Sequence, residues 1–263
     1  MIKSLLTNKV NRLFLLLGGF FISNALVAEF IGVKIFSLER TLGIQPMGWT
    51  IFGVEGLGFD LTAGVVLWPI VFVMTDVINE YFGQHGVRTL SYAAIGFILY
   101  AFLMIYMAMG LTPNEWWQYQ SGTLVQDTSK HVNDMSLAFN RIFGQGLWII
   151  VGSLVAFLVG QIVDVFTFHR IKKITGEKKV WLRATGSTLV SQFIDSFVVL
   201  FIAFYIGSDW DLVRVLAIGV MNYIFKFIVA VGLTPVIYVL HHIIDSYLGA
   251  EVAHDLKVEA ANS

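Results

Sequence analysis

The sequence predicts an all-α membrane protein that crosses the bilayer several times, and three observations lead to this class. Hydrophobic residues make up 57% of the 263 residues, whereas charged residues make up only 13%. A soluble globular domain carries about 25% charged residues, so this chain lacks the charges that a water-facing surface needs. The mean hydropathy is +0.75, and long apolar runs recur along the whole sequence.

The apolar runs are predicted to form six spans within a single transmembrane domain, residues 1–263, because each is close to the roughly 20 residues that a membrane helix needs. Lys3, Lys9 and Arg12 precede the first run, as in a signal peptide. Leu26 stands where cleavage at Ala28 would require a small residue, so this run is interpreted as an uncleaved span. The predicted spans cover residues 13–36, 61–82, 89–111, 142–166, 184–206 and 212–241.

Three polar or Gly-rich segments separate or follow these spans. Residues 43–60 contain five Gly and one Pro, which are too many helix breakers for a plain helix. Residues 112–140 form the longest polar segment, and the tail at 250–263 is polar as well. We expect this tail to be either disordered or a short surface helix.

The distribution of Lys and Arg orients the spans. If the N-terminus is cytoplasmic, eleven of the 17 Lys and Arg lie on that side, five lie on the opposite side, and Lys226 falls within the sixth span. Cytoplasmic loops of membrane proteins carry an excess of these residues. We therefore expect both termini to be cytoplasmic, with the second and fourth spans running inward.

Several functions are disfavoured by what the sequence lacks. It has no cysteine, which excludes thiolate nucleophiles and Cys-based zinc sites, and its net charge of −1 gives no reason to expect a nucleic-acid partner. The six His form no H-E-x-x-H motif, and neither G-x-S-x-G nor a Walker A motif occurs. We expect no catalytic residue, no metal and no cofactor. A driving force would come from an ion gradient, substrate trapping or another subunit.

The second predicted span carries charges near its end. Asp76, Asn79 and Glu80 are spaced i, i+3 and i+4, so their side chains share one helical face. A carboxylate within a membrane helix costs about 2.5–3.5 kcal/mol on insertion scales. Acids at a helix C-terminus also oppose the helix dipole. A sequence that accepts both costs in one stretch is expected to use these charges.

Four other spans carry polar side chains at depth, placed to point at a common interior. They are Asn24 and Glu29 in the first span, Gln161 and Asp164 in the fourth, Ser191, Gln192 and Asp195 in the fifth, and Asn222 and Lys226 in the sixth.

Structural roles compete with a functional one for these groups. Amides and hydroxyls can simply bond neighbouring helices, at about 0.6 kcal/mol on average. Lys226 could form a buried structural ion pair, the acids at the helix ends could pair with Arg88 and Arg170, and Glu29 could be solvated near the outer surface. A polar cavity is the better explanation for the number of buried charges, namely Asp76, Glu80, Asp164, Asp195 and Lys226.

Four stretches of the sequence resemble the queuosine precursor transporter family. They are WPIVFVMTDVINEYFG from Trp68, GQIVDVFTFHRIKK from Gly160, RATGSTLVSQFIDSFVVLFIAF from Arg183 and NYIFKFIVAVGLTPVIY from Asn222. They occur in the order of the family and cover most of the second, fourth, fifth and sixth spans. The first span and the loop at 112–140 match little.

The resemblance implies a six-span bacterial inner-membrane protein, related to the substrate-binding components of energy-coupling factor transporters but working without their ATPase. It implies import of the 7-deazaguanine bases preQ0 or preQ1, for salvage of queuosine in tRNA. The expected partners are this small-molecule substrate and the lipid bilayer, and a homodimer stays open. The positions that match the motifs are Asp76, Glu80, Gln161, Asp164, Gln192, Asp195, Asn222 and Lys226, and Asn79 joins them as a candidate substrate-binding residue.

We hypothesise roles for these residues from the chemistry of a planar base. Asp195 or Asp76 would accept from the ring N–H and the exocyclic amine, and an amide or Lys226 would bond the carbonyl. Three alternatives remain: a membrane subunit that needs a separate ATPase, an intramembrane enzyme acting on a lipid or base, and a structural scaffold. The enzyme is disfavoured because no nucleophile–base signature occurs.

Overall fold

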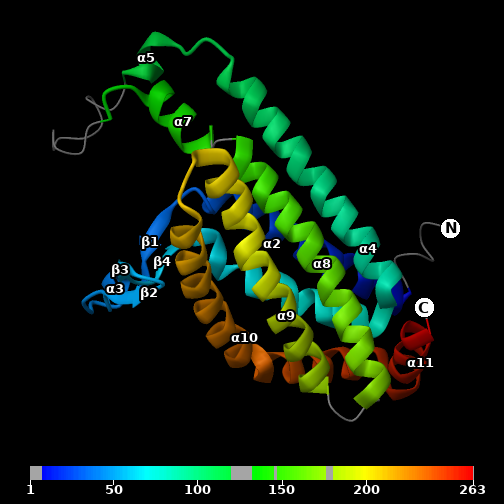
Figure 1. Cartoon of the computed structure of the whole chain (residues 1–263). Helices are drawn as coiled ribbons and strands as arrows, with labels where there is room; N and C mark the ends of the chain where they lie inside the picture. The colour runs from blue at the N-terminus through cyan, green and yellow to red at the C-terminus, as the bar shows by residue number, and fades with distance from the viewer. Residues whose placement is uncertain (1–7, 120–131, 145–146, 176–179, 263) are drawn as a thin grey trace.

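The computed structural model describes residues 8–119, 132–144, 147–175 and 180–262. Its main elements are helices, and five of them are long and apolar enough to cross a membrane. Figure 1 shows them gathered into one bundle, with the C-terminal helix and the start of α2 at the same end. The five helices are α2 (Lys9–Ile31), α4 (Trp68–Met109), α8 (Leu147–Thr175), α9 (Val180–Leu200) and α10 (Leu212–Leu248). The prediction of an all-α polytopic membrane protein is confirmed.

Five long helices are one fewer than the six predicted spans, because α4 joins the predicted second and third spans. Gly83 interrupts α4 with non-helical backbone angles, φ 65° and ψ −171°. In Figure 1 the first part of α4 runs toward the C-terminal end of the bundle and the second part runs back toward α5 (Glu115–Gln118). The turn needs no loop, since glycine lacks the Cβ that makes these angles costly.

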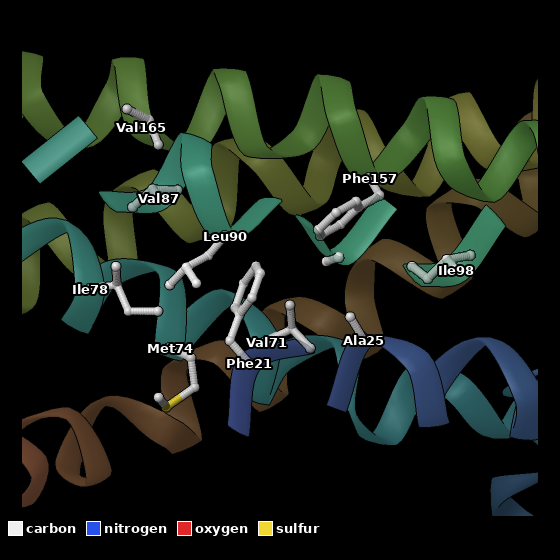
Figure 2. Packing of buried hydrophobic residues seen from close by; sticks show 11 residues of the cluster. Phe21, Ala25, Val71, Met74, Ile78, Val87, Leu90, Ile98, Phe157 and Val165 are labelled. Carbon is white, nitrogen blue, oxygen red and sulfur yellow. The ribbon is translucent and has the colours of Figure 1, made fainter. Parts of the chain in front are cut away.

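The apolar core lies between α2, both segments of α4 and α8. Figure 2 shows the side chains of Phe21, Leu90 and Phe157 turned toward one another there, and Met74 belongs to the same buried cluster. Phe21 belongs to α2, Met74 and Leu90 belong to the two segments of α4, and Phe157 belongs to α8. All four are buried. Because Met74 precedes Gly83 and Leu90 follows it, the core holds the two segments of α4 against each other and against α2.

A small β region caps the end of the bundle away from the termini, where the sequence predicted a broken link. It contains β1 (Ile35–Ser37) paired with β4 (Asp60–Thr62), β2 (Trp49–Ile51) paired with β3 (Val54–Leu57), and helix α3 (Leu38–Thr41). The predicted first span is therefore too long, since α2 ends at Ile31. The predicted second span begins too early, since residues 61–62 are strand and a 3-10 turn, η1 (Ala63–Val66), precedes α4.

Glu39 anchors this cap from a buried position. Its Oε1 accepts a hydrogen bond of 2.8 Å from the Phe59 N–H, and its Oε2 accepts one of 3.3 Å from the Ser37 hydroxyl. Burial raises the pKa of the Glu39 carboxyl, but the hydrogen bonds outweigh burial and hold the pKa below its usual value of 4.5. The carboxylate thus joins α3 to the strand region across 20 residues of sequence.

The remaining boundaries also differ from the predicted ones. A short helix, α7 (Met135–Phe143), takes the start of the predicted fourth span, and α8 continues to Thr175, nine residues beyond the predicted end of that span at residue 166. The fifth span ends in a π-helical turn, η4 (Phe201–Ile206). The polar tail forms helix α11 (Ala250–Asn262), and this matches the surface-helix alternative rather than the disordered one.

We predict that Gly83→Ala destabilises the protein by about 1–3 kcal/mol, since the left-handed, extended angles of Gly83 are almost exclusive to glycine. Gly96→Ala in the second segment of α4 is the matched control, because a Cβ there would meet nothing within 4 Å. Thermal unfolding of both variants in detergent measures the difference. Equal unfolding temperatures for the two variants would show that Gly83 does not shape the turn.

Candidate functional site

The first segment of α4 and helix α8 run in the same direction and face each other with polar side chains. Thr75 Oγ1 lies 3.1 Å from Gln161 Oε1. Further along both helices, Asn79 Oδ1 lies 2.8 Å from His169 Nε2, and then Glu80 forms an ion pair of 3.4 Å with Lys172. The polar positions of α8 advance along the sequence as those of α4 do, so one face of each helix is matched to the other.

Helix α9 packs antiparallel to α8 and adds a row of hydroxyls to the same interior. Ser191 Oγ donates to Asp164 Oδ1 over 3.0 Å. Asp195 stands one turn after Ser191 on α9, and it lies beside Gly160, which stands one turn before Asp164 on α8. A Cβ added at Gly160 would be 3.8 Å from the Asp195 Cβ. Hydroxyls fit here because a serine or threonine in a helix can bond its own backbone and a neighbouring helix.

We call Asp76, Asp164, Ser187, Thr188 and Ser191 the acid cluster. Both Asp76 oxygens accept hydrogen bonds, 3.1 Å from Ser187 and 2.8 Å from Thr188. The two aspartates are close enough for their charges to interact, and their exposed fractions are 1% and 0%. Within the described residues, neither aspartate forms an ion pair with a lysine or arginine. The cluster therefore holds buried acid without a fixed cation from the described part of the chain.

Several polar atoms around the acid cluster have no hydrogen-bond partner among the residues that the structure describes. They are Asp164 Oδ2, both amide atoms of Gln192, Gln161 Nε2 and Asn79 Nδ2. Ser187 also interacts with Asp164, but its single hydroxyl proton serves one acceptor at a time, and Asp76 at 3.1 Å and the Ala184 carbonyl oxygen at 3.0 Å compete for it. Leaving a buried polar group unpaired costs about 1–3 kcal/mol, so this set of donors and acceptors is an expensive arrangement for a purely structural interior.

A second charged group lies toward the capped end of the bundle. Lys226 of α10 forms an ion pair with Asp195 of α9, and both side chains are buried. Glu29 of α2 accepts a hydrogen bond from Ser153 of α8 and is close enough to Asp195 for their charges to interact. Glu29 is half-buried, and these contacts direct its carboxyl group toward α8 and α9.

The other end of the interior is closed by a network around α11. Tyr81 Oη donates to Asp245 Oδ1 over 2.7 Å and lies 3.1 Å from His241 Nδ1. Lys257 of α11 bonds both Asp245 oxygens at 2.9 Å. Polar contacts therefore continue from the acid cluster through Asn79 and Glu80 to the end of the bundle that carries α11.

The structure brings eight of the nine predicted site residues into this interior. Asn222 is the exception, because it is only half-buried and its amide donates to the carbonyl of Ile218 in its own helix. Asn24 bonds its own helix in the same way, through Phe20. Glu80 forms an ion pair with Lys172, a partner that the sequence did not suggest for the helix-end acids.

Sequence reasoning missed most of the residues that hold the acids in place, since among them it had named only Ser191 as a polar side chain at depth. Ser187, Thr188 and Ser191 bond the aspartates, Thr75 faces Gln161, and His169 faces Asn79. A usable signal was present, since polar residues recur at three- and four-residue spacing from Ser187 to Ser196 along one face of an otherwise apolar span. The histidine gave no comparable signal, because its partner lies on another helix.

We predict that Lys226→Met destabilises the protein by about 3–5 kcal/mol, because it leaves the buried Asp195 charge unpaired. The double variant Asp195→Asn, Lys226→Met is expected to be more stable than Lys226→Met alone, since it also removes the Asp195 charge that the single change leaves unpaired. Chemical unfolding of the wild type, both single variants and the double variant gives the coupling energy. Strictly additive losses would contradict a direct pair between the two residues.

Comparison with known proteins places this interior within a family. A family model described as "Putative vitamin uptake transporter" matches residues 62–240, which include α4, α8, α9 and most of α10. The chain is 31% identical to the probable queuosine precursor transporter of Bacillus subtilis (strain 168), over 70% of this chain and 73% of that protein. It is 28% identical to the queuosine precursor transporter of Escherichia coli (strain K12), over 68% and 71% of the two chains.

A probable queuosine precursor transporter of Haemophilus influenzae is 25% identical, over 73% of this chain and 72% of that protein. No solved structure matches the chain. The family model covers more than half of the chain, and the Bacillus relative is matched over most of its length. The resemblance inferred from the four sequence stretches is confirmed: this multi-pass membrane protein belongs to the putative vitamin uptake transporter family, the family of the queuosine precursor transporters.

Proposed function

We propose that this chain imports queuosine precursors, the 7-deazaguanine bases preQ0 and preQ1, across the bacterial inner membrane for salvage into tRNA. The names of its relatives support the substrate class. The observation that carries the proposal is the set of unpaired donors and acceptors around the acid cluster. A planar base with N–H groups and a carbonyl on one edge is the kind of ligand that such a mixed set binds.

The structure supports a revised assignment of roles. Asp76 has both oxygens occupied by hydroxyls and Asp195 is paired with Lys226, so Asp164 Oδ2 is the better acceptor for the ring N–H and the exocyclic amine. Gln192 offers a donor to the ring carbonyl and an acceptor to a further N–H, and Gln161 Nε2 offers a second donor. Asp76 then positions the hydroxyls, and Lys226 balances Asp195.

The charge of the interior favours a cationic ligand. Asp76 and Asp164 interact electrostatically and have no cationic partner within the part of the chain described. The aminomethyl group of preQ1 is an ammonium at neutral pH and preQ0 carries a neutral nitrile in its place. An ammonium next to two buried carboxylates lowers the cost of keeping both in the membrane, so preQ1 is the preferred substrate of the two.

Transport requires the interior to open in turn to each side, because the acid cluster is closed in this conformation. Glu80 with Lys172, and Tyr81 with Asp245, lie between the acid cluster and the end that carries α11. We assign these contacts to the inner gate, with both termini in the cytoplasm. Breaking them separates α4 from α8 and α10, which frees a polar route without exposing backbone to lipid. The chain then acts as a transporter and not as an enzyme.

Uptake of labelled preQ1 by cells that cannot synthesise it tests the proposal. We predict that this chain restores uptake and that Gln192→Leu lowers it at least about tenfold, because the buried amide no longer bonds the base. Asn24→Leu is the matched control, since the Asn24 amide bonds its own helix, and it is expected to transport normally. Excess unlabelled preQ1 is expected to compete better than preQ0.

Purified protein in liposomes separates this proposal from its alternatives. Uptake without any partner would exclude a subunit that depends on a separate ATPase. Product formation without translocation would instead identify an intramembrane enzyme. If Gln192→Leu and Asn24→Leu, at equal abundance in the membrane, both transport like the wild type, the assigned binding site is wrong.

A further inference from the structure

A groove of about 600 Å³ lies outside the acid cluster, between the second segment of α4 and helix α8. We call it the α4–α8 groove. Along α8 it extends from Leu158 to Ile174, which is about 24 Å of helix, and on α4 it is bordered by Gln84, Arg88 and Ser91. Its residues on α8 recur at three- and four-residue spacing, so one face of this helix lines the whole groove.

The groove is basic at one end and mainly apolar at the other. Arg88, Arg170 and Lys173 lie at the end where α8 approaches Thr175, and all three are exposed. None of the residues that line the groove is an aspartate or glutamate. Toward the start of α8 the wall of the groove contains the apolar residues Leu158, Ile162 and Val165. This division of charge and apolar surface complements an amphiphile with an anionic head.

A buried hydroxyl lies between these two ends. Ser91 has an exposed fraction of 4% and borders the groove. Its Oγ has no hydrogen-bond partner among the described residues, although a serine in a helix commonly bonds a carbonyl of its own preceding turn. It stands one turn beyond Arg88, where an acceptor on a bound molecule would satisfy it.

We propose that the α4–α8 groove binds one anionic phospholipid. Its phosphate lies between Arg170, Lys173 and Arg88, a glycerol ester carbonyl accepts from Ser91, and an acyl chain follows α8 toward Leu158. Basic pockets between membrane helices are suited to anionic head groups. The basic end of the groove lies at the end of the bundle where most of the Lys and Arg are found. We expect this end to face the cytoplasmic leaflet, whose anionic lipids attract basic residues.

The groove is a poorer match for the transported base than for a lipid. Its charged rim offers cations only, whereas the unpaired carboxylate oxygen that suits an N–H edge belongs to Asp164 in the acid cluster. Gln161 and His169 border the groove as well as the interior. A lipid in the groove therefore fills the seam between α4 and α8 on the side away from the substrate.

Native mass spectrometry of the purified full chain, with added phosphatidylglycerol or phosphatidylcholine, tests the proposal. We expect the wild type to retain phosphatidylglycerol selectively. We expect the double variant Arg170→Gln, Lys173→Gln to bind phosphatidylglycerol at least about tenfold more weakly, because each of the two removed basic residues contributes to anionic-lipid binding. The matched control is Lys34→Gln, Arg40→Gln, which removes two charges at the capped end and is expected to bind like the wild type. Both groove side chains are exposed, so unfolding temperatures are expected to stay unchanged.

Leu158→Trp separates binding in the groove from adsorption on its rim. It fills the apolar section without changing any charge, and we expect it to weaken retention of phosphatidylglycerol while unfolding remains cooperative. The proposal is overturned if Leu158→Trp binds like the wild type, if both charge-removing pairs weaken binding equally, or if inorganic phosphate displaces the lipid at matched concentration. The last result would identify a site for free anions instead.

Discussion

Carboxylates buried in a membrane bundle must find their partners within the protein, because the bilayer core supplies no water to replace them. In this chain the requirement is met by matching the faces of three helices. The first segment of α4 and helix α8 run in parallel, so Thr75, Asn79 and Glu80 meet successive polar residues of α8. The antiparallel α9 adds the hydroxyls that hold Asp76 and Asp164. A shift of one residue in any of these helices would turn several charges toward apolar neighbours.

Close contacts at small residues keep the helices in this arrangement. A Cβ at Gly64 would stand 2.5 Å from the Ala28 carbonyl oxygen, and one at Gly160 would stand 3.3 Å from the Phe72 ring. Such approaches are typical of membrane helices, whose association depends on packing rather than on a hydrophobic driving force. Gly83 contributes differently, because it reverses α4 and brings Leu90 back onto Phe21 in the core. The apolar packing thus fixes the frame within which the polar faces meet.

Composition and hydropathy were enough to predict the all-α membrane class, and spacing was enough to find four of the five buried carboxylates among the described residues, with Glu39 as the exception. The prediction of two separate helices failed at α4, because a single glycine with unusual angles replaces the loop that was expected between the second and third spans. The β cap was missed because its strands have only three or four residues, too few to show an alternating pattern. Asn222 was misplaced in the interior, since helical periodicity gives the shared face of two residues but not how deeply that face is buried.

The partners of the acids were harder to predict than the acids themselves. Ser187 and Thr188 are unremarkable within one span, and they gain importance only from Asp76, more than 100 residues away. Pairing across helices depends on crossing geometry, which no local pattern records. The same holds for the α4–α8 groove, whose basic end is formed by Arg88 and Arg170 from segments far apart in the sequence. Charge and spacing identified the groups, and the fold decided which of them meet.

A structure of the protein with bound preQ1 tests the central claim most directly. The account predicts that the base lies within hydrogen-bonding distance of Asp164 Oδ2 and of the Gln192 amide, with its ammonium facing Asp76. A base bound instead in the α4–α8 groove or against the β cap, with the acid cluster unchanged, would contradict the account.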